Sequence, residues 1–269
     1  MKYLGGKIRL GKHIAPILAD LWRQNSYVAY FEPFCGALGV MRSVLPLLNL
    51  SPTARVIAND YHPDLIKMWE EVQRGTFRYP SEVSEDDYLK AKELQSPNAL
   101  KAFVGFGLGF GGRFFGSFAL KHANNKKEDF LKEMTNSLKR TAPFIQNVEF
   151  ICKDYRAFQP KGMLIYADPP YKSEQFPIKY RRDTKHYDKF DTDAFWETMR
   201  TWSQCNMVVI SEMSAPSDFV EIWEHSSHRS ACQSAKTRYK SGTTQKYKKE
   251  KLFIHKSFLS SHPPPPTSS

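Results

Sequence analysis

The sequence predicts an α/β fold with a doubly wound, mostly parallel sheet, an inserted, mainly helical lobe and a C-terminal β-hairpin. Two observations carry this prediction. Short apolar runs alternate with amphipathic helical patterns in residues 1–74, and apolar runs return after residue 147. Such alternation at short spacing is typical of parallel sheets. We therefore expect a core domain formed by residues 1–74 and 148–258, and an inserted lobe at residues 75–147.

The first half of the sheet is expected to begin after an amphipathic helix. The expected elements are a helix at 11–22, a strand at 28–34, a turn and helix at 35–48, a strand at 54–60 and a helix at 63–74. Each strand pattern ends in polar residues. In open α/β sheets, ligands bind beyond the carboxyl ends of the strands, so these polar ends are candidates for a site.

The second half repeats this pattern and ends in a basic region. The expected elements are strands at 148–154, 162–171 and 206–213, a helix at 192–204, a basic hairpin at 229–256 and a disordered tail at 259–269. The tail, S-S-H-P-P-P-P-T-S-S, has no residues that could form a core.

Composition excludes several classes of protein. No apolar run of the 269 residues approaches the length of a transmembrane helix, and the N-terminal segment has no apolar signal region. The four cysteines form no C-x-x-C pair, which indicates reduced thiols rather than a zinc site. We expect a cytoplasmic protein that needs no metal and no membrane.

The charge indicates a polyanionic partner. The formal net charge is +11, and residues 229–256 contain nine Lys or Arg and one acidic residue. A solvated basic face is the alternative interpretation.

The most informative pattern is Y-A-D-P-P-Y-K at residues 166–172. Asp168 ends an apolar run, and the two prolines after it have no backbone N–H and a fixed φ. The carboxylate of Asp168 and the carbonyl of Pro169 can therefore accept hydrogen bonds from an exocyclic amino group. The ring of Tyr171 offers a flat face on which a base can stack. An ordinary Pro-Pro turn after a strand is the alternative.

D-P-P-Y resembles the catalytic motif of the amino-methyltransferases, and its aspartate form is typical of DNA adenine-N6 enzymes. Further segments are similar to Dam-type (class alpha) enzymes, in the same order: Y-L-G-G-K at 3–7, F-E-P-F-C-G-A-L-G-V at 31–40 and A-N-D-Y at 58–61. The resemblance covers about residues 1–258. It implies a Rossmann-like fold of the S-adenosylmethionine-dependent methyltransferase type. It also implies site-specific methyl transfer to N6 of an adenine flipped from double-stranded DNA.

The resemblance implies roles for individual residues. The catalytic set is Asp168, Pro169, Pro170 and Tyr171. The set that binds S-adenosyl-L-methionine is Tyr3, Lys7, Glu32, Pro33, Phe34, Gly36, Gly39, Asp60, Asp154, Tyr155 and Asp168. Lys7 is expected to pair with the methionine carboxylate. Asp60 suits the ribose hydroxyls, as an acidic residue does in dinucleotide sites.

DNA contacts are expected from basic side chains. The candidates are Arg113, Arg181, Arg182, Lys185, Arg238 and Lys240. Those in the hairpin would bind phosphates, which gives affinity without sequence information. Base readout is expected from the inserted lobe, where Arg113, Asn124 and Asn125 are weak candidates.

The stretch F-V-G-F-G-L-G-F-G-G-R-F-F-G-S-F at residues 103–118 contains a match to the dinucleotide fingerprint G-x-G-x-x-G. It lies in the inserted lobe and does not join a strand to a helix, so we interpret the match as chance. We expect its glycines to allow close packing while its phenylalanines fill the core of the lobe. This is the least family-like part of the sequence.

Two other functions are compatible with the chemistry. One is methylation of an RNA adenine or a protein amide, although those enzymes more often carry N-P-P-Y. The other is a non-catalytic DNA-binding protein on the same scaffold. The sequence leaves open a cognate restriction endonuclease or a phage or prophage orphan enzyme, and a monomer or a weak dimer.

Overall fold

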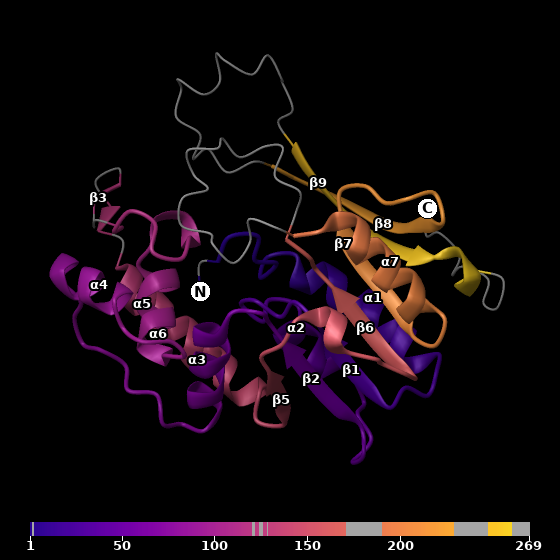
Figure 1. Ribbon diagram of the computed structural model, residues 1–269, viewed down its shortest axis with the longest axis horizontal. Helices are drawn as coiled ribbons and strands as arrows, with labels where there is room; N and C mark the ends of the chain where they lie inside the picture. Colours follow the sequence, from indigo (N-terminus) through magenta and orange to yellow (C-terminus); the bar gives the residue numbers. More distant parts are fainter. Residues whose placement is uncertain are drawn as a thin grey trace.

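The computed structural model describes residues 1, 3–119, 122–123, 126–127, 129–170, 190–228 and 247–259. Figure 1 shows a central sheet with helices on both faces and a helical lobe beside it. The strands of the main sheet are β1 (Ala29–Glu32), β2 (Arg55–Asn59), β5 (Val148–Ile151), β6 (Met163–Ala167), β7 (Met207–Glu212), β8 (Phe219–His228) and β9 (Tyr247–His255). The helices are α1 (Gly11–Arg23), α2 (Met41–Val44), α3 (Pro63–Gln73), α4 (Glu85–Lys92), α5 (Ala99–Gly107), α6 (Phe130–Thr141) and α7 (Thr192–Ser203).

Within the described residues, the main sheet has seven strands in the order β5-β2-β1-β6-β7-β9-β8. β1 pairs in parallel with β2 and β6, β2 with β5, and β6 with β7. β9 is antiparallel to both β7 and β8. The strand order reverses between β1 and β6, and the carboxyl ends beside this point are where such sheets bind ligands. The predicted mixed α/β fold with a mostly parallel sheet is confirmed.

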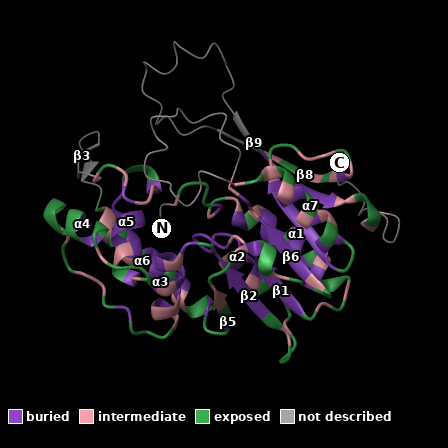
Figure 2. Ribbon diagram, in the orientation of Figure 1, coloured by how far each residue is buried: buried purple, intermediate pink, exposed green. Residues whose placement is uncertain are grey.

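Alternation along the strands divides the core into two layers. Tyr30, Tyr166 and Val209 pack with α1 on one face of the sheet, whereas Phe31 and Ile165 pack with α7 on the other. Successive side chains of a strand point to opposite faces of the sheet. Because both faces are covered by helices, the central strands appear in the sequence as continuous apolar runs. Figure 2 shows the buried strands between these helices.

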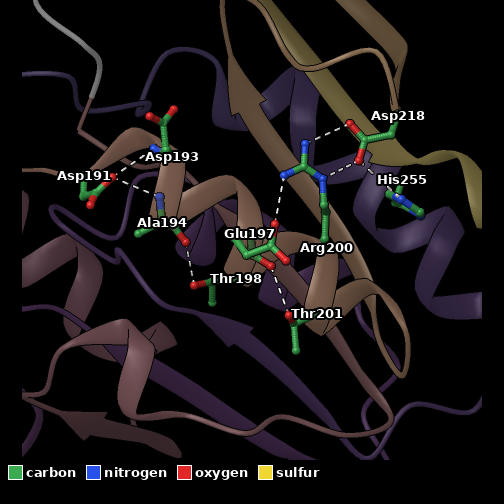
Figure 3. Close-up of polar contacts among 9 residues, drawn as sticks. All are labelled: Asp191, Asp193, Ala194, Glu197, Thr198, Arg200, Thr201, Asp218 and His255. Carbon is green, nitrogen blue, oxygen red and sulfur yellow. Dashed lines mark hydrogen bonds and ion pairs between the residues drawn. The ribbon is translucent and has the colours of Figure 1, made fainter.

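Polar contacts hold α7 to the hairpin formed by β8 and β9 (Figure 3). Asp191 caps the helix by accepting hydrogen bonds from the N–H groups of Asp193 and Ala194. On the next turns, Arg200 forms two hydrogen bonds to Asp218, with Nε 2.6 Å from Oδ2 and Nη2 3.1 Å from Oδ1. Asp218 directly precedes β8, so this pair fixes the start of the hairpin against α7.

The inserted lobe contains α4, α5 and α6, and two short strands, β3 (His122–Ala123) and β4 (Lys126–Lys127). α5 packs against α3, α4 and α6. A Cβ atom at Gly105 would lie 2.7 Å from the rings of Phe114 and Phe115, and one at Gly107 would lie 2.6 Å from Met134. The prediction that these glycines serve close packing is confirmed, and the fingerprint match is chance.

The turn and helix predicted at residues 35–48 are present, and α2 continues directly into a 3₁₀ turn at Leu45–Leu47. The predicted hairpin was wrong in its bounds. The hairpin begins at Phe219, ten residues before the basic run, because β8 is not basic. Its glutamates pair with lysines of β9, with Glu221 2.7 Å from Lys251 and Glu224 2.9 Å from Lys249. The predicted turn at residues 238–242 and residues 260–269 of the tail lie outside the described residues.

None of the described helices combines the length and the apolar character needed to cross a membrane.

Candidate active site

Four polar side chains lie on one face of the sheet, at or near the carboxyl ends of the parallel strands. Glu32 ends β1 on the side of Tyr30, and Asp168 follows β6 on the side of Tyr166. Ser211 on β7 and Glu250 on β9 lie on the same face of the sheet, because alternate side chains of a strand point to the same side. Apolar residues of these strands contact α1, and the segment before α1 carries Lys7. The sheet and this segment therefore form a buried polar cluster.

The ammonium group of Lys7 lies at the centre of this cluster. Its Nζ is 2.6 Å from Oδ1 of Asp168 and 3.5 Å from Oε1 of Glu250. The same Oε1 accepts a hydrogen bond of 2.8 Å from the hydroxyl of Ser211. Lys7 and Glu250 are buried, while the Asp168 side chain is 17% exposed. A buried lysine of this kind needs charged partners, and Lys7 has two carboxylates.

Glycine positions Lys7. A Cβ atom at Gly39 would lie 2.8 Å from the backbone nitrogen of Ile8 and 3.0 Å from the carbonyl carbon of Lys7. Any larger residue at position 39 would push the N-terminal segment away from the loop after β1. The second glycine of this loop thus has a packing role that brings Lys7 to the strand ends.

Burial makes weak acids of Glu32, which belongs to this cluster, and of Glu212, which interacts with it through charge. It raises the pKa of Glu32 to about 8, with the hydrogen bond from Tyr30 opposing and the charge of Asp168 adding to the effect. Burial also raises the pKa of Glu212, the last residue of β7, to about 7. The Met213 N–H opposes this second shift, Asp168 adds to it and Lys7 opposes it. Desolvation favours the neutral acid in both cases.

The loop after β1 is fixed by the end of β2. The backbone N–H of Gly36 donates to Oδ2 of Asp60 and that of His62 donates to Oδ1, both at 3.0 Å. Burial raises the pKa of Asp60, and these backbone hydrogen bonds oppose the shift. Asn59 donates to the carbonyl of Pro33 at 2.9 Å. Asp60 is thus a structural anchor of the loop, and the predicted ribose contact remains a prediction.

Tyr3 lies over this loop. Gly36 has a φ of +45°, and a Cβ atom there would lie 3.0 Å from the Tyr3 ring. The same ring packs on Phe106 of α5, with centroids 5.0 Å apart. The N–H of Leu4 donates to the carbonyl of Gly112 at 3.2 Å. The N-terminal segment therefore contacts both the loop after β1 and the inserted lobe.

The other end of the loop meets the segment after β5. The rings of Phe34 and Tyr155 pack with centroids 5.0 Å apart, on the face of the sheet covered by α7. Asp154 accepts hydrogen bonds from the backbone and side chain of Arg156 and caps the turn Tyr155–Ala157. The hydrogen bond from the Arg156 side chain is the main reason that the pKa of Asp154 is lowered. Asp154 thus has a structural role as a cap, and its contact with the cofactor stays a prediction.

The structure thus brings most predicted cofactor residues to one edge of the sheet. Arg113 lies in the inserted lobe, directly after the turn Phe110–Gly112. The remaining predicted site residues lie outside the described residues: Tyr171, Arg181, Arg182, Lys185, Arg238 and Lys240, as do Asn124 and Asn125.

Sequence reasoning missed Ser211, Glu212 and Glu250. Ser211 and Glu212 end an apolar run, which is the same signal that identified Asp168. Glu250 is the one acidic residue in the basic run 229–256, and that contrast was a usable signal. Among the described residues, no group of three or more His, Cys, Asp or Glu could hold a metal ion.

The polar strand ends, the glycine loop and D-P-P at the switch point are features of a nucleotide-cofactor enzyme of the methyltransferase type. A sequence profile of the D12 class N6 adenine-specific DNA methyltransferase family matches residues 3–101 and 115–251. The chain therefore belongs to the D12 class N6 adenine-specific DNA methyltransferase family. It is a methyltransferase that uses S-adenosylmethionine to methylate N6 of adenine in DNA. The gap in the match, residues 102–114, falls in the Gly/Phe stretch, as predicted for the least family-like part.

Solved structures with a similar fold are also methyltransferases. TrmN from Thermus thermophilus is 12% identical with a TM-score of 0.37, over 91% of this chain and 48% of TrmN, so the chain spans about half of that protein. The rRNA methyltransferase AviRa from Streptomyces viridochromogenes is 10% identical with a TM-score of 0.39, over 95% of this chain and 88% of AviRa. Magnesium protoporphyrin IX methyltransferase from Synechocystis PCC 6803, with bound SAM, is 8% identical with a TM-score of 0.37, over 94% of this chain and 80% of that chain. No curated protein sequence matches the chain significantly.

The residues of the site suit S-adenosylmethionine. Its methionine end carries an ammonium and a sulfonium group, and buried carboxyl groups such as Glu32 and Glu212 are available to face such charges. Because Gly36 has no side chain, the Tyr3 ring can lie directly against the loop after β1, where a Cβ atom would be only 3.0 Å from it. The cofactor has no phosphate, so the loop after β1 does not need a full phosphate cradle.

Proposed function

We propose that this enzyme is a site-specific methyltransferase that acts on an adenine flipped out of double-stranded DNA. The observation that carries the proposal is Asp168, held 2.6 Å from Lys7 at the switch point of the sheet and followed by two prolines. Base flipping is required because the N6 amino group of a paired adenine is not accessible to such a recessed group.

In the proposed mechanism, the protein orients the amino group. The Asp168 carboxylate and the Pro169 carbonyl accept hydrogen bonds from N6 and direct its lone pair, and Tyr171 stacks on the base. S-adenosylmethionine supplies an electrophilic methyl group on its sulfonium sulfur. The N–CH3 bond would form as the S–CH3 bond breaks, which leaves neutral-sulfur S-adenosylhomocysteine. N6 becomes acidic as it gains the methyl group and loses its proton to water, so no strong general base is required. Alignment and fixed dipoles account for most of the acceleration.

Cofactor binding is proposed at the loop after β1. Tyr3 and Lys7 would lie at the methionine end, Asp60 near the ribose, and Phe34 with Tyr155 near the adenine ring. The packing of Tyr3 over Gly36 and of Phe34 on Tyr155 supports this arrangement. Lys7 would have to bind the methionine carboxylate while it also holds Asp168.

DNA binding is proposed for the inserted lobe, residues 75–147, and the basic hairpin. Arg113 would contribute to base readout. The basic residues that follow D-P-P-Y, Arg181, Arg182 and Lys185, would lie near the flipped nucleotide, and Arg238 and Lys240 of the hairpin would bind phosphates. Lys249 and Lys251 of β9 already pair with glutamates of β8. We therefore assign the phosphate contacts to basic residues other than Lys249 and Lys251.

The proposal is tested with purified protein, tritiated S-adenosylmethionine and matched double-stranded and single-stranded DNA. We expect label in N6-methyladenine of double-stranded DNA and a loss of at least about 1,000-fold in rate for Asp168→Ala. A 2-aminopurine at the target position should brighten on binding, because flipping unstacks it. Label in single-stranded DNA alone, or no fluorescence change, would contradict the proposal.

A further inference from the structure

Glu250 is a buried acidic residue that the proposed mechanism does not use. It lies on the antiparallel strand β9, and the neighbouring inward side chains, Leu252 and Ile254, belong to the apolar core. Glu250 is 2% exposed. Burial of a carboxylate in an apolar layer is costly, and a buried ion pair contributes little to stability compared with an apolar replacement. A purely structural role therefore gives little reason for this residue.

The contacts of Glu250 lead to Asp168 in two steps. Oε1 of Glu250 accepts a hydrogen bond of 2.8 Å from Ser211 and lies 3.5 Å from Nζ of Lys7. Lys7 in turn lies 2.6 Å from Oδ1 of Asp168. Ser211 fixes the carboxylate of Glu250, and Glu250 gives the Lys7 ammonium a second carboxylate anchor besides Asp168.

The second anchor matters because a lysine side chain is long and its ammonium group is not directional. Asp168 is the nearest carboxylate to Lys7, and the carbonyl of Gly5 accepts only a long hydrogen bond of 3.4 Å. Without Glu250, Lys7 could rotate about several bonds and still keep its ion pair with Asp168. A second carboxylate restricts the position of the ammonium group, and with it the orientation of the Asp168 carboxylate. Small errors in the orientation of a reacting group cost a large part of the rate.

We propose that Glu250 is a positioning residue that orients Asp168 through Lys7, which makes the antiparallel hairpin part of the active site. This inference rests on the proposed role of Asp168. Glu250 touches neither the adenine nor the cofactor in this account, so its removal should lower kcat and leave the KM for DNA almost unchanged.

The test is a double-mutant cycle between Glu250 and Lys7, measured as kcat for methylation of double-stranded DNA. We expect Glu250→Ala to lower kcat about 10-fold, and Glu250→Gln to stay within about 3-fold, because its amide oxygen can still accept from Ser211 and Lys7. The variant carrying both Lys7→Met and Glu250→Ala should be no slower than Lys7→Met alone, within about 2-fold.

A second cycle covers the case in which Lys7→Met fails to fold. Ser211 acts through Glu250, so Ser211→Ala should add no loss to that of Glu250→Ala. Glu149→Gln is the matched control, because it removes an exposed carboxylate that pairs with Arg55 elsewhere on the same sheet, and its kcat should equal that of the wild type. Thermal unfolding of each variant checks the fold.

If the enzyme is active and the kcat loss of a double variant in either cycle equals the product of its two single losses, the role of Glu250 is overturned. The proposed function then remains intact. A loss confined to the KM for DNA would overturn it as well. A wild-type protein that forms no N6-methyladenine would overturn both proposals.

Discussion

At the scale of single residues, the site is a group of carboxyl groups around one lysine. Asp168, Glu32, Glu212 and Glu250 interact through charge with each other or with Lys7. Burial holds a proton on Glu32 at neutral pH, since its pKa is about 8, and leaves Glu212 near half-protonated, since its pKa is about 7. The negative charge of the cluster is therefore adjustable, which suits a cofactor that arrives with a sulfonium cation and leaves without it.

The first prediction concerns cofactor affinity and pH. Ionisation of Glu212, with a pKa of about 7, should make the site more attractive to the sulfonium cation as pH rises from 6 to 8. We expect the Kd for S-adenosylmethionine to fall over this range, and that for neutral-sulfur S-adenosylhomocysteine to change less. Titration calorimetry of both ligands measures this, and the shared amino group makes the second a control. Parallel pH profiles would contradict the charge argument.

A second prediction concerns stability. Between pH 4.5, the ordinary pKa of a glutamate, and about 8, the folded protein holds a proton on Glu32 that the unfolded chain has lost. The free energy of unfolding should therefore fall as pH rises through this window, by up to about 1.4 kcal/mol per pH unit. Glu32→Gln removes this dependence, so the variant should match the wild type near pH 4.5 and be more stable at pH 8.5. Urea unfolding across this range tests it, and equal slopes would contradict it.

At the scale of elements, the glycine- and phenylalanine-rich stretch at residues 103–118 shows how glycines let backbone segments of the lobe pack in direct contact. A Cβ atom at Gly109 would lie 2.1 Å from the carbonyl oxygen of Arg113 and 2.6 Å from that of Gly105. Both neighbours are backbone atoms, which cannot move aside as a flexible side chain can.

A third prediction follows for this element. Gly109→Ala should lower the free energy of unfolding by about 1–3 kcal/mol, the usual cost of overpacking. Gly116→Ala is the matched control, since its nearest neighbour is the Cβ atom of Arg113 at 3.3 Å. Denaturant unfolding of both variants measures the difference, and equal stability would contradict the packing role.

The elements also show which parts of the structure were predictable. The parallel strands were predictable, because strands that are buried on both faces consist of apolar runs that end in polar residues. β8 was not, because its glutamates serve cross-strand pairs with Lys249 and Lys251 and break the apolar run. Asp168 was recognised from the end of its apolar run and from its prolines. Glu250 stands out as the one acidic residue of the basic run, but its partner Lys7 lies 243 positions away, and no local pattern encodes that contact.

At the scale of the whole molecule, the N-terminal segment joins the proposed recognition lobe to the proposed cofactor site. Tyr3 contacts Gly36 and Phe106, and Leu4 bonds to Gly112. Phe106 and Gly112 lie in residues 102–114, which the family profile does not match, so this contact joins a matched segment to an unmatched one.

A fourth prediction places sequence preference in this part. Arg113→Ala should relax the choice of methylated site and keep the unfolding midpoint, because a base-reading arginine is worth about 1–3 kcal/mol of discrimination. Methylation of a library of randomised duplexes, read by sequencing, measures the preference. An unchanged preference and rate would remove Arg113 from the proposed readout.

The most direct test of the account is modification-sensitive sequencing of DNA from cells that express the wild-type protein or Asp168→Ala. It reports the base, the position and the sequence context of methylation together. We predict N6-methyladenine at one recurring motif with the wild type and none above background with the variant. No N6-methyladenine with the wild type, or equal methylation with the variant, would contradict the account.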